Sequence, residues 1–196
     1  MHQIIFIDGY SGIGKTTLAK QLWKHYQSTY IEQYMIPEFL TKDGTTKITG
    51  KDEDETLYSS MVALIKNFCK LGYKNIIALD FNEMRMRDIP EDFCGYDFLI
   101  LRLVCDENQN ITQMQNRGKG LVDIEMLKEC YRRNALFPRP HLPNEHIIDV
   151  TNKTPNQVFE IAKNIINTAK SELNYTYQKP DKKHFGTWVL ADKDDI

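Results

Sequence analysis

One eight-residue motif near the amino terminus constrains the fold of this chain more than any other feature. Residues 9–16 are Gly-Tyr-Ser-Gly-Ile-Gly-Lys-Thr and match the phosphate-loop pattern GxxxxGK[ST] in full. The motif follows a short apolar run at residues 3–8. It precedes residues 15–26, where apolar side chains recur at helical spacing. This strand–loop–helix context is the one in which a phosphate loop works, so the motif predicts a nucleotide-binding α/β domain.

The residues of the motif provide the groups that hold a triphosphate. Glycines let the backbone turn so that its N–H groups point at phosphate oxygens, and the helix that follows adds its positive end. Lys15 reaches the β- and γ-phosphates, and the Thr16 hydroxyl is placed to bind Mg²⁺. We therefore expect ATP with Mg²⁺. The predicted nucleotide-binding residues are Gly9, Tyr10, Ser11, Gly12, Ile13, Gly14, Lys15, Thr16 and Thr17.

Strands and helices are predicted to alternate along the rest of the chain. Apolar runs predict four further buried strands, at residues 30–34, 75–80, 97–105 and 146–150. Helical spacing predicts helices at residues 54–71, 106–117 and 123–136, and a last one after a capping box at Thr154 and Gln157. This order predicts an α/β fold, with a doubly wound parallel sheet of about five strands and helices on both faces.

The predicted domain covers residues 1–170. Within it, residues 35–52 are polar and contain Pro37, Gly44 and Gly50, which predicts a loop or a small mobile insertion. Residues 171–196 fall outside the alternation of strands and helices. They are polar but carry aromatic side chains, so we expect this extension to pack on the domain.

Charge and composition make several other classes of protein unfavourable. A formal net charge of −2 and a pI near 6.2 argue against a broad basic face for nucleic acid. No apolar stretch approaches the length of a membrane span, the four cysteines form no CxxC pair, and the five histidines show no metal-ligand spacing. We expect a cytoplasmic protein with a small-molecule substrate and neither a nucleic-acid nor a membrane partner. The oligomeric state is left open.

Three sequence patterns together resemble a known group of enzymes. The chain contains FIDGYSGIGKTT at the phosphate loop, LDFNEMRMR at the end of a predicted strand, and NRGKG between two predicted helices. It resembles small-molecule and nucleoside or nucleotide kinases of the adenylate kinase and shikimate kinase type, in element order over residues 3–170. The resemblance implies a P-loop kinase with a closing lid, here at about residues 117–123.

The resemblance implies roles for residues after the third strand. Asp80 would orient Mg²⁺ through water, whereas the structural alternative is an aspartate that caps the next turn. Arg85 and Arg87 follow at the carboxyl end of that strand, where substrates collect in open α/β sheets, and would contact the acceptor. The alternative is that both are solvated surface arginines.

Further charged residues are candidates for catalysis. Arg117 in the lid and Arg132 and Arg133 on the next helix would stabilise the transferring phosphoryl group, unless they only interact with a helix end. Glu32, at the end of the second strand, would accept the proton of the acceptor hydroxyl. Glu38 and Asp8 are the alternatives for this base.

The chain departs from the nucleoside monophosphate kinases in one respect. No arginine occurs between Ser28 and Met84, the region where those enzymes usually bind the monophosphate. A lysine ammonium lacks the bidentate fit of a guanidinium, so this absence favours an uncharged hydroxyl acceptor. Residues 151–154 follow the last strand, where relatives pack a loop against adenine. Because Pro155 stands where the guanine-specific NKxD motif has aspartate, a GTPase switch is disfavoured.

The leading hypothesis is therefore an ATP-dependent kinase acting on a small hydroxyl-bearing metabolite, such as a nucleoside or nucleotide. One alternative is an ATP-binding regulatory or partner module with weak ATPase activity. A second alternative is a polynucleotide 5′-hydroxyl kinase, which the acidic pI disfavours.

Overall fold

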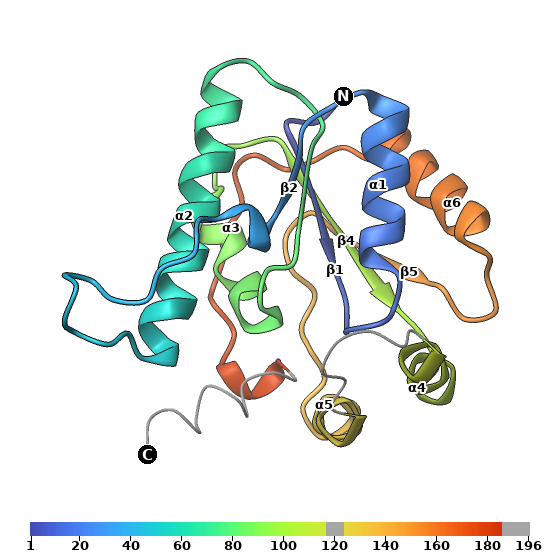
Figure 1. Ribbon diagram of the computed structural model, residues 1–196. Coiled ribbons are helices and arrows are strands. Elements are labelled where there is room, and N and C mark those ends of the chain that lie inside the picture. Colours follow the sequence, from blue (N-terminus) through green and yellow to red (C-terminus); the bar gives the residue numbers. More distant parts are fainter. Residues whose placement is uncertain (117–123, 186–196) are drawn as a thin grey trace.

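The computed structural model describes residues 1–116 and 124–185 of the 196-residue chain. Its described residues form a five-stranded parallel sheet in the order β2-β3-β1-β4-β5, with helices on both faces (Figure 1). This confirms the predicted doubly wound α/β fold. The strands are β1 (Ile4–Asp8), β2 (Tyr30–Glu32), β3 (Ile76–Leu79), β4 (Phe98–Val104) and β5 (Glu145–Asp149).

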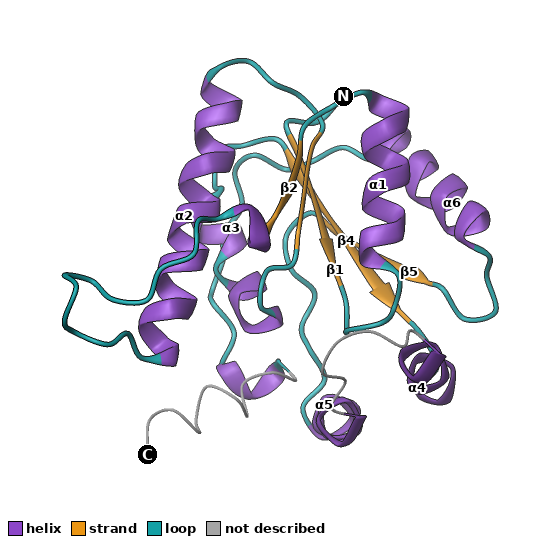
Figure 2. Ribbon diagram, viewed as in Figure 1, coloured by secondary structure: helices purple, strands orange, loops and turns teal. Residues whose placement is uncertain are grey.

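Helices cover both faces of the sheet (Figure 2), and an apolar core lies on each face. On one face, Ile5 and Ile7 pack with α1 (Lys15–Tyr26) and α6 (Pro155–Thr168). On the other face, Ile4 and Phe6 pack with α2 (Gly50–Lys70) and α3 (Ile89–Asp92). Every residue of β1 is buried, as expected of a parallel strand covered on both faces. The continuous apolar run of this strand is therefore explained by its central place in the sheet.

The remaining helices lie beyond the carboxyl ends of the strands. These are α4 (Glu107–Asn116) and α5 (Ile124–Leu136), which Figure 1 shows end-on below β1 and β4. Asp123, the predicted start of α5, and the predicted lid at residues 117–123 lie outside the described residues. Among the described helices, none combines the length and apolar character needed to cross a bilayer.

Two predicted boundaries in the first half of the chain are wrong. The strand predicted to reach residue 34 ends at Glu32, and a 3₁₀ helix, Gln33–Met35, follows it. The helix predicted from residue 54 begins at Gly50, so the insertion is shorter than expected. The reason is a capping box between Thr49 and Asp52, which satisfies the first N–H groups of α2 despite the glycine at its first position.

Two further boundaries differ after β3. The segment with Arg85 and Arg87, where no helix was predicted, is a 3₁₀ helix, Glu83–Arg87, in which the Met84 N–H donates to the Asn82 side chain. The last strand is Glu145–Asp149, one residue earlier than predicted. The capping box at Thr154 that was expected to start α6 is present.

The described part of the carboxyl-terminal extension contacts the α3 region. Tyr175 Oη donates to the Pro90 carbonyl at 2.6 Å, and Tyr177 Oη donates to the Arg87 carbonyl at 2.7 Å. After a short 3₁₀ helix, Lys182–His184, the Phe185 side chain is fully buried. Residues 171–185 therefore add apolar burial to the domain, although the separate status of the extension stays a prediction.

Candidate functional site

The phosphate loop lies where the order of the sheet reverses. Because β1 has β3 on one side and β4 on the other, the loop after it opens at the switch point where α/β sheets bind ligands. Gly12 and Gly14 have φ angles of 79° and 105°, in the left-handed region that favours glycine. A Cβ on Gly12 would also lie 2.3 Å from Met114 Cγ on α4, so a larger residue would displace either the loop or α4.

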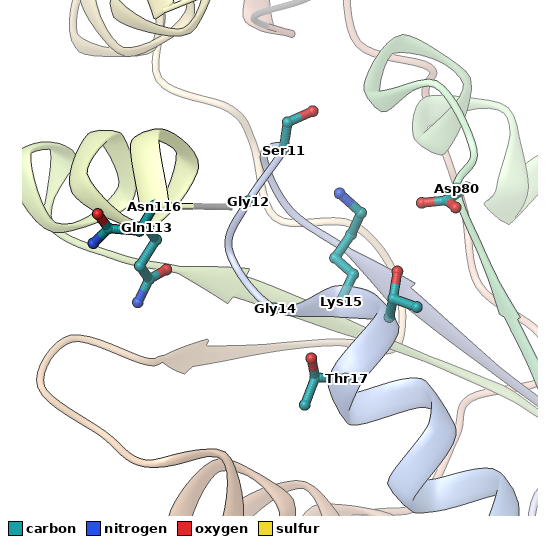
Figure 3. Close-up of a pocket in the computed structure, with 9 residues that line it drawn as sticks. Ser11, Gly12, Gly14, Lys15, Thr17, Asp80, Gln113 and Asn116 are labelled. Atoms are coloured by element: carbon teal, nitrogen blue, oxygen red, sulfur yellow. The ribbon is translucent and has the colours of Figure 1, made fainter. Parts of the chain in front are cut away.

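The helix α4 also holds the loop by a polar contact. Asn110 is fully buried, and its Nδ2 donates to the Ser11 carbonyl at 2.8 Å. Two further α4 residues, Gln113 and Asn116, line the cavity beside the loop (Figure 3). None of these three residues was predicted as part of the site, because a polar helix gives no indication of which amides face a ligand.

A cavity of about 550 Å³ opens against the loop and the first turn of α1. In Figure 3, the Lys15 side chain extends between the loop and Asp80. Lys15 Nζ donates to the carbonyls of Gly9 and Tyr10 at 2.8 and 3.2 Å, which holds the ammonium at the mouth of the loop. The lining residues are Ser11, Gly12, Gly14, Lys15, Thr16, Thr17, Asp80, Gln113 and Asn116. The cavity therefore presents backbone N–H groups and a cation where a phosphate chain would lie.

The groups on one side of this cavity fit Mg²⁺. Thr16 Oγ1 donates to Glu32 Oε1 at 3.5 Å, and Glu32 is only 2% exposed. Glu32 Oε2 is buried without a hydrogen-bond partner. A hard cation with its water would satisfy such an oxygen, since Mg²⁺ prefers oxygen ligands and retains several waters. Asp80, with φ 64°, has the left-handed backbone that non-glycine residues rarely adopt, and it lies on the same cavity.

A second, more apolar cavity of about 190 Å³ adjoins the first. It shares Gly12, Gly14 and Thr17 with the phosphate side, and is closed by Leu103, Val150 and Val158 from the sheet and α6. Lys153, in the loop that the resemblance places against adenine, and Pro155, the first residue of α6, also line it. Flat apolar walls next to a phosphate site suit a nucleobase.

A buried charge cluster lies behind the loop. It consists of Arg139, 1% exposed at its side chain, and the carboxylates of Asp8, Glu83 and Glu145. Arg139 Nη1 pairs with Asp8 Oδ2, Nη2 donates to Glu145 Oε1 at 2.6 Å, and Nη1 lies 3.9 Å from Glu83 Oε1. Burial opposes ionisation of Asp8, but the neighbouring Arg139 guanidinium outweighs it and lowers the pKa of Asp8. Asp8, one alternative for the base, is thus held in an ion pair.

This buried arginine cluster was not predicted from the sequence. Arg139 stands between Pro138 and Pro140 after α5, and nothing local in that segment indicates a buried partner. The polar residue that ends the apolar run of β1, Asp8, was the one available indication.

Burial, together with the nearby Asp8 carboxylate, raises the pKa of Glu83 to about 7. When folding raises the pKa of a carboxyl, its contribution to stability is complete at pH values below its pKa in the unfolded chain. This contribution is lost as the pH rises through its pKa in the folded protein. We therefore expect the free energy of unfolding of Glu83→Gln to match wild type at about pH 4, below the pKa of an unfolded-state glutamate. By pH 8 the variant should be more stable by on the order of 2 kcal/mol, because glutamine mimics the neutral carboxyl.

Urea denaturation of both proteins at a series of pH values measures this difference. Glu160→Gln, at an exposed position on α6, is the control and should follow the wild-type profile. Parallel profiles of Glu83→Gln and wild type would show that Glu83 does not titrate in this range.

Most of the arginines that were predicted to act in the site form ion pairs or hydrogen bonds with other residues of the chain. Arg85 pairs with Asp54, Glu55 and Asp88, and its guanidinium lies over the Tyr58 ring. These contacts place Arg85 against α2, outside the residues that line the 550 Å³ cavity. The role of Arg85 toward the acceptor stays a prediction.

The other predicted arginines contact protein groups outside the 550 Å³ cavity or lie outside the described residues. Arg87 Nη1 donates to the Pro180 carbonyl at 2.9 Å in the carboxyl-terminal extension. Arg132 and Arg133 both contact Glu129 on their own helix, and Arg117 lies outside the described residues. Their roles in phosphoryl transfer stay predictions.

Solved structures resemble this fold at low sequence identity. A sugar kinase from Janibacter sp. HTCC2649 superposes with a TM-score of 0.61 at 17% identity, over 86% of this chain and 96% of that one. A gluconokinase from Sinorhizobium meliloti 1021 gives 0.57 at 14%, over 85% and 97%. Thymidylate kinase from Candida albicans gives 0.50 at 19%, over 85% and 92%. No protein-family model matches the sequence, and no curated protein does. The chain thus has the fold of the P-loop kinases.

Proposed function

We propose that this chain, with its P-loop kinase fold, transfers the γ-phosphoryl group of ATP to a hydroxyl of a small molecule, with Mg²⁺ as cofactor. The observation that carries the proposal is the 550 Å³ cavity, where Lys15, Thr16 and Asp80 meet at the mouth of a complete phosphate loop. The apolar 190 Å³ cavity beside it gives the nucleobase a place. Proteins that share the fold are sugar and nucleotide kinases by name, which supports a small-molecule acceptor.

Each residue of the site has a proposed role in phosphoryl transfer. Backbone N–H groups of the loop and the Lys15 ammonium bind phosphate oxygens and hold the transferring group in line. Thr16 would provide a hydroxyl ligand to the metal, and Asp80 would orient the water around it. When bound, Mg²⁺ neutralises charge on the phosphate oxygens. Glu32, buried beside Thr16, is the proposed base that orients the acceptor hydroxyl and takes its proton.

Glu32→Gln tests the assignment of the base. We expect it to lower kcat by about 10²–10⁴-fold, the usual contribution of a general base, while the KM for ATP changes little. The measurement is transfer of labelled phosphate to a panel of hydroxyl-bearing metabolites. If Glu38→Gln in the exposed insertion abolishes transfer and Glu32→Gln does not, the base is assigned to the wrong carboxylate.

The same panel separates the two alternative functions. Failure with every small acceptor, together with ATP turnover that depends on a partner protein, would indicate a regulatory module. Phosphorylation of oligonucleotide 5′-hydroxyls with salt-sensitive binding would indicate a polynucleotide kinase.

A further inference from the structure

A third cavity, of about 120 Å³, adjoins the first residues of the phosphate loop and shares Leu103 with the nucleobase cavity. It is enclosed by the first residues of the loop, the carboxyl half of β4 and the α5 helix. Its lining residues are Gly9, Tyr10, Glu83, Arg102, Leu103, Val104, Cys105, Tyr131 and Asn134. Since an engineered cavity of about 150 Å³ holds one benzene ring, this one suits a group of about four or five non-hydrogen atoms.

The cavity is lined by one acidic and one basic side chain, and Glu83 forms its ion pair with Arg139 and not with Arg102. Glu83 is only 7% exposed, and its Oε2 is buried without a hydrogen-bond partner. Arg102 lines the same cavity from β4 and makes no hydrogen bond or ion pair with the described residues. A buried, unpaired carboxyl oxygen is costly unless a ligand or water satisfies it. The arrangement therefore offers one hydrogen-bonding carboxyl and one open guanidinium to a ligand.

The cavity also adjoins the end of the loop where the γ-phosphate would lie. The carbonyls of Gly9 and Tyr10 accept hydrogen bonds from Lys15 Nζ, and both residues line the cavity. A molecule seated there would have one end held beside the ammonium that binds the γ-phosphate. Tyr10 closes the side toward α5, where its ring packs edge-on against Tyr131 at 4.8 Å between centroids.

We propose that this cavity binds the carboxylate end of the acceptor and that the acceptor class is small polyhydroxylated carboxylic acids. Arg102 pairs with the carboxylate, for which a planar guanidinium has a bidentate fit. The Glu83 carboxyl hydrogen-bonds the hydroxyl next to it. This inference rests on the proposed kinase function and names its substrate class, in place of the uncharged acceptor that the absence of arginine between Ser28 and Met84 favoured.

The charges around Glu83 set a pH dependence for this binding. Glu83 faces Asp8 on β1, Tyr10 and Lys15 of the loop and first turn, Arg102 on β4, Cys130 on α5, and Arg139. An incoming carboxylate adds a negative charge, which favours the neutral form of Glu83. The KM for the acid should therefore rise as pH increases above 7.

The experiment compares acceptors that differ at one end. The purified protein is assayed with the aldonic acid, the aldose and the alditol that share one short carbon skeleton. Binding of each compound is measured by calorimetry with a non-hydrolysable MgATP analogue present. We expect the acid to have a kcat/KM at least ~100-fold above its neutral partners, because they leave Arg102 unpaired. Arg102→Gln should raise the KM for the acid at least ~10-fold with little change in the KM for ATP.

The controls separate this inference from the proposed function. Lys163→Gln on α6 also removes one positive charge and should leave both KM values unchanged. Arg102→Lys covers the case in which Arg102→Gln does not fold, and should weaken acid binding with the charge retained. Equal use of neutral and acid acceptors, no binding of any acid by calorimetry, or a change in the KM for ATP alone on Arg102→Gln would each overturn the inference. If the wild-type protein did not bind MgATP, the proposed kinase function itself would be overturned.

Discussion

Replacing Lys15 with alanine is expected to lower phosphoryl transfer by about 10²–10³-fold or more, the effect of removing one donor that stabilises developing charge. Lys15 Nζ is held between the Gly9 and Tyr10 carbonyls, so the ammonium is fixed at the loop mouth before any phosphate arrives. The loss should be seen in kcat and in the affinity for ATP, because the ammonium contacts phosphate in both the ground and transition states. Initial rates with labelled ATP measure it.

The matched control for this experiment is Lys20→Ala, an exposed lysine on the same helix. It removes the same charge from α1 without touching the loop, and should retain wild-type rates. Circular dichroism and the urea midpoint show whether each variant is folded. If Lys15→Ala retained more than a tenth of wild-type transfer, the loop would not be the site of phosphate binding.

The core of the fold and the phosphate loop could be predicted from the sequence because the deciding physics there is local. The β1 run is apolar at all positions that lie between the two helix layers, and Gly12 and Gly14 adopt backbone angles that few other residues allow. Glycine at position 14 and the periodic residues after it set the start of α1. These features depend on residues a few positions apart.

The rest of the candidate site could not be predicted because it depends on contacts between distant segments. Arg139 reaches Asp8, 131 residues away in the sequence, and Asn110 braces Ser11 across 99 residues. The start of α2 at Gly50 was missed for the opposite reason: the capping box is local, but glycine at the first position made the segment resemble a loop. Polar residues at helix and strand ends indicate where a site lies. They do not indicate which distant residues they contact.

Arg139→Met is expected to destabilise the protein by about 3–5 kcal/mol, the cost of breaking a buried ion pair from one side. The variant would leave the carboxylates of Asp8, Glu83 and Glu145 buried without their shared cation. It would also remove the cation that lies 5.3 Å from the centroid of the buried Phe185 ring, in the carboxyl-terminal extension. Urea denaturation followed by circular dichroism gives the free energy of unfolding.

Two further variants serve as controls for this prediction. Arg132→Met removes an arginine that is 58% exposed and paired on its own helix, so its urea midpoint should equal that of wild type. Arg139→Lys keeps the charge without the two-sided fit and should be intermediate in stability. A loss below about 1 kcal/mol for Arg139→Met would mean that the cluster relaxes or hydrates when the arginine is removed.

The most direct test of the central claim is calorimetric titration of the purified chain with a non-hydrolysable ATP analogue and Mg²⁺. The geometry of the loop and the two cavities beside it predicts saturable binding at one site, with a Kd between about 1 μM and 1 mM, the range usual for enzyme substrates. Lys15→Ala should weaken that binding at least ~10-fold, and Lys20→Ala should not. The claim that the phosphate loop binds a nucleotide would be contradicted if a folded protein gave no binding heat with the Mg²⁺ complexes of either adenine or guanine nucleotides.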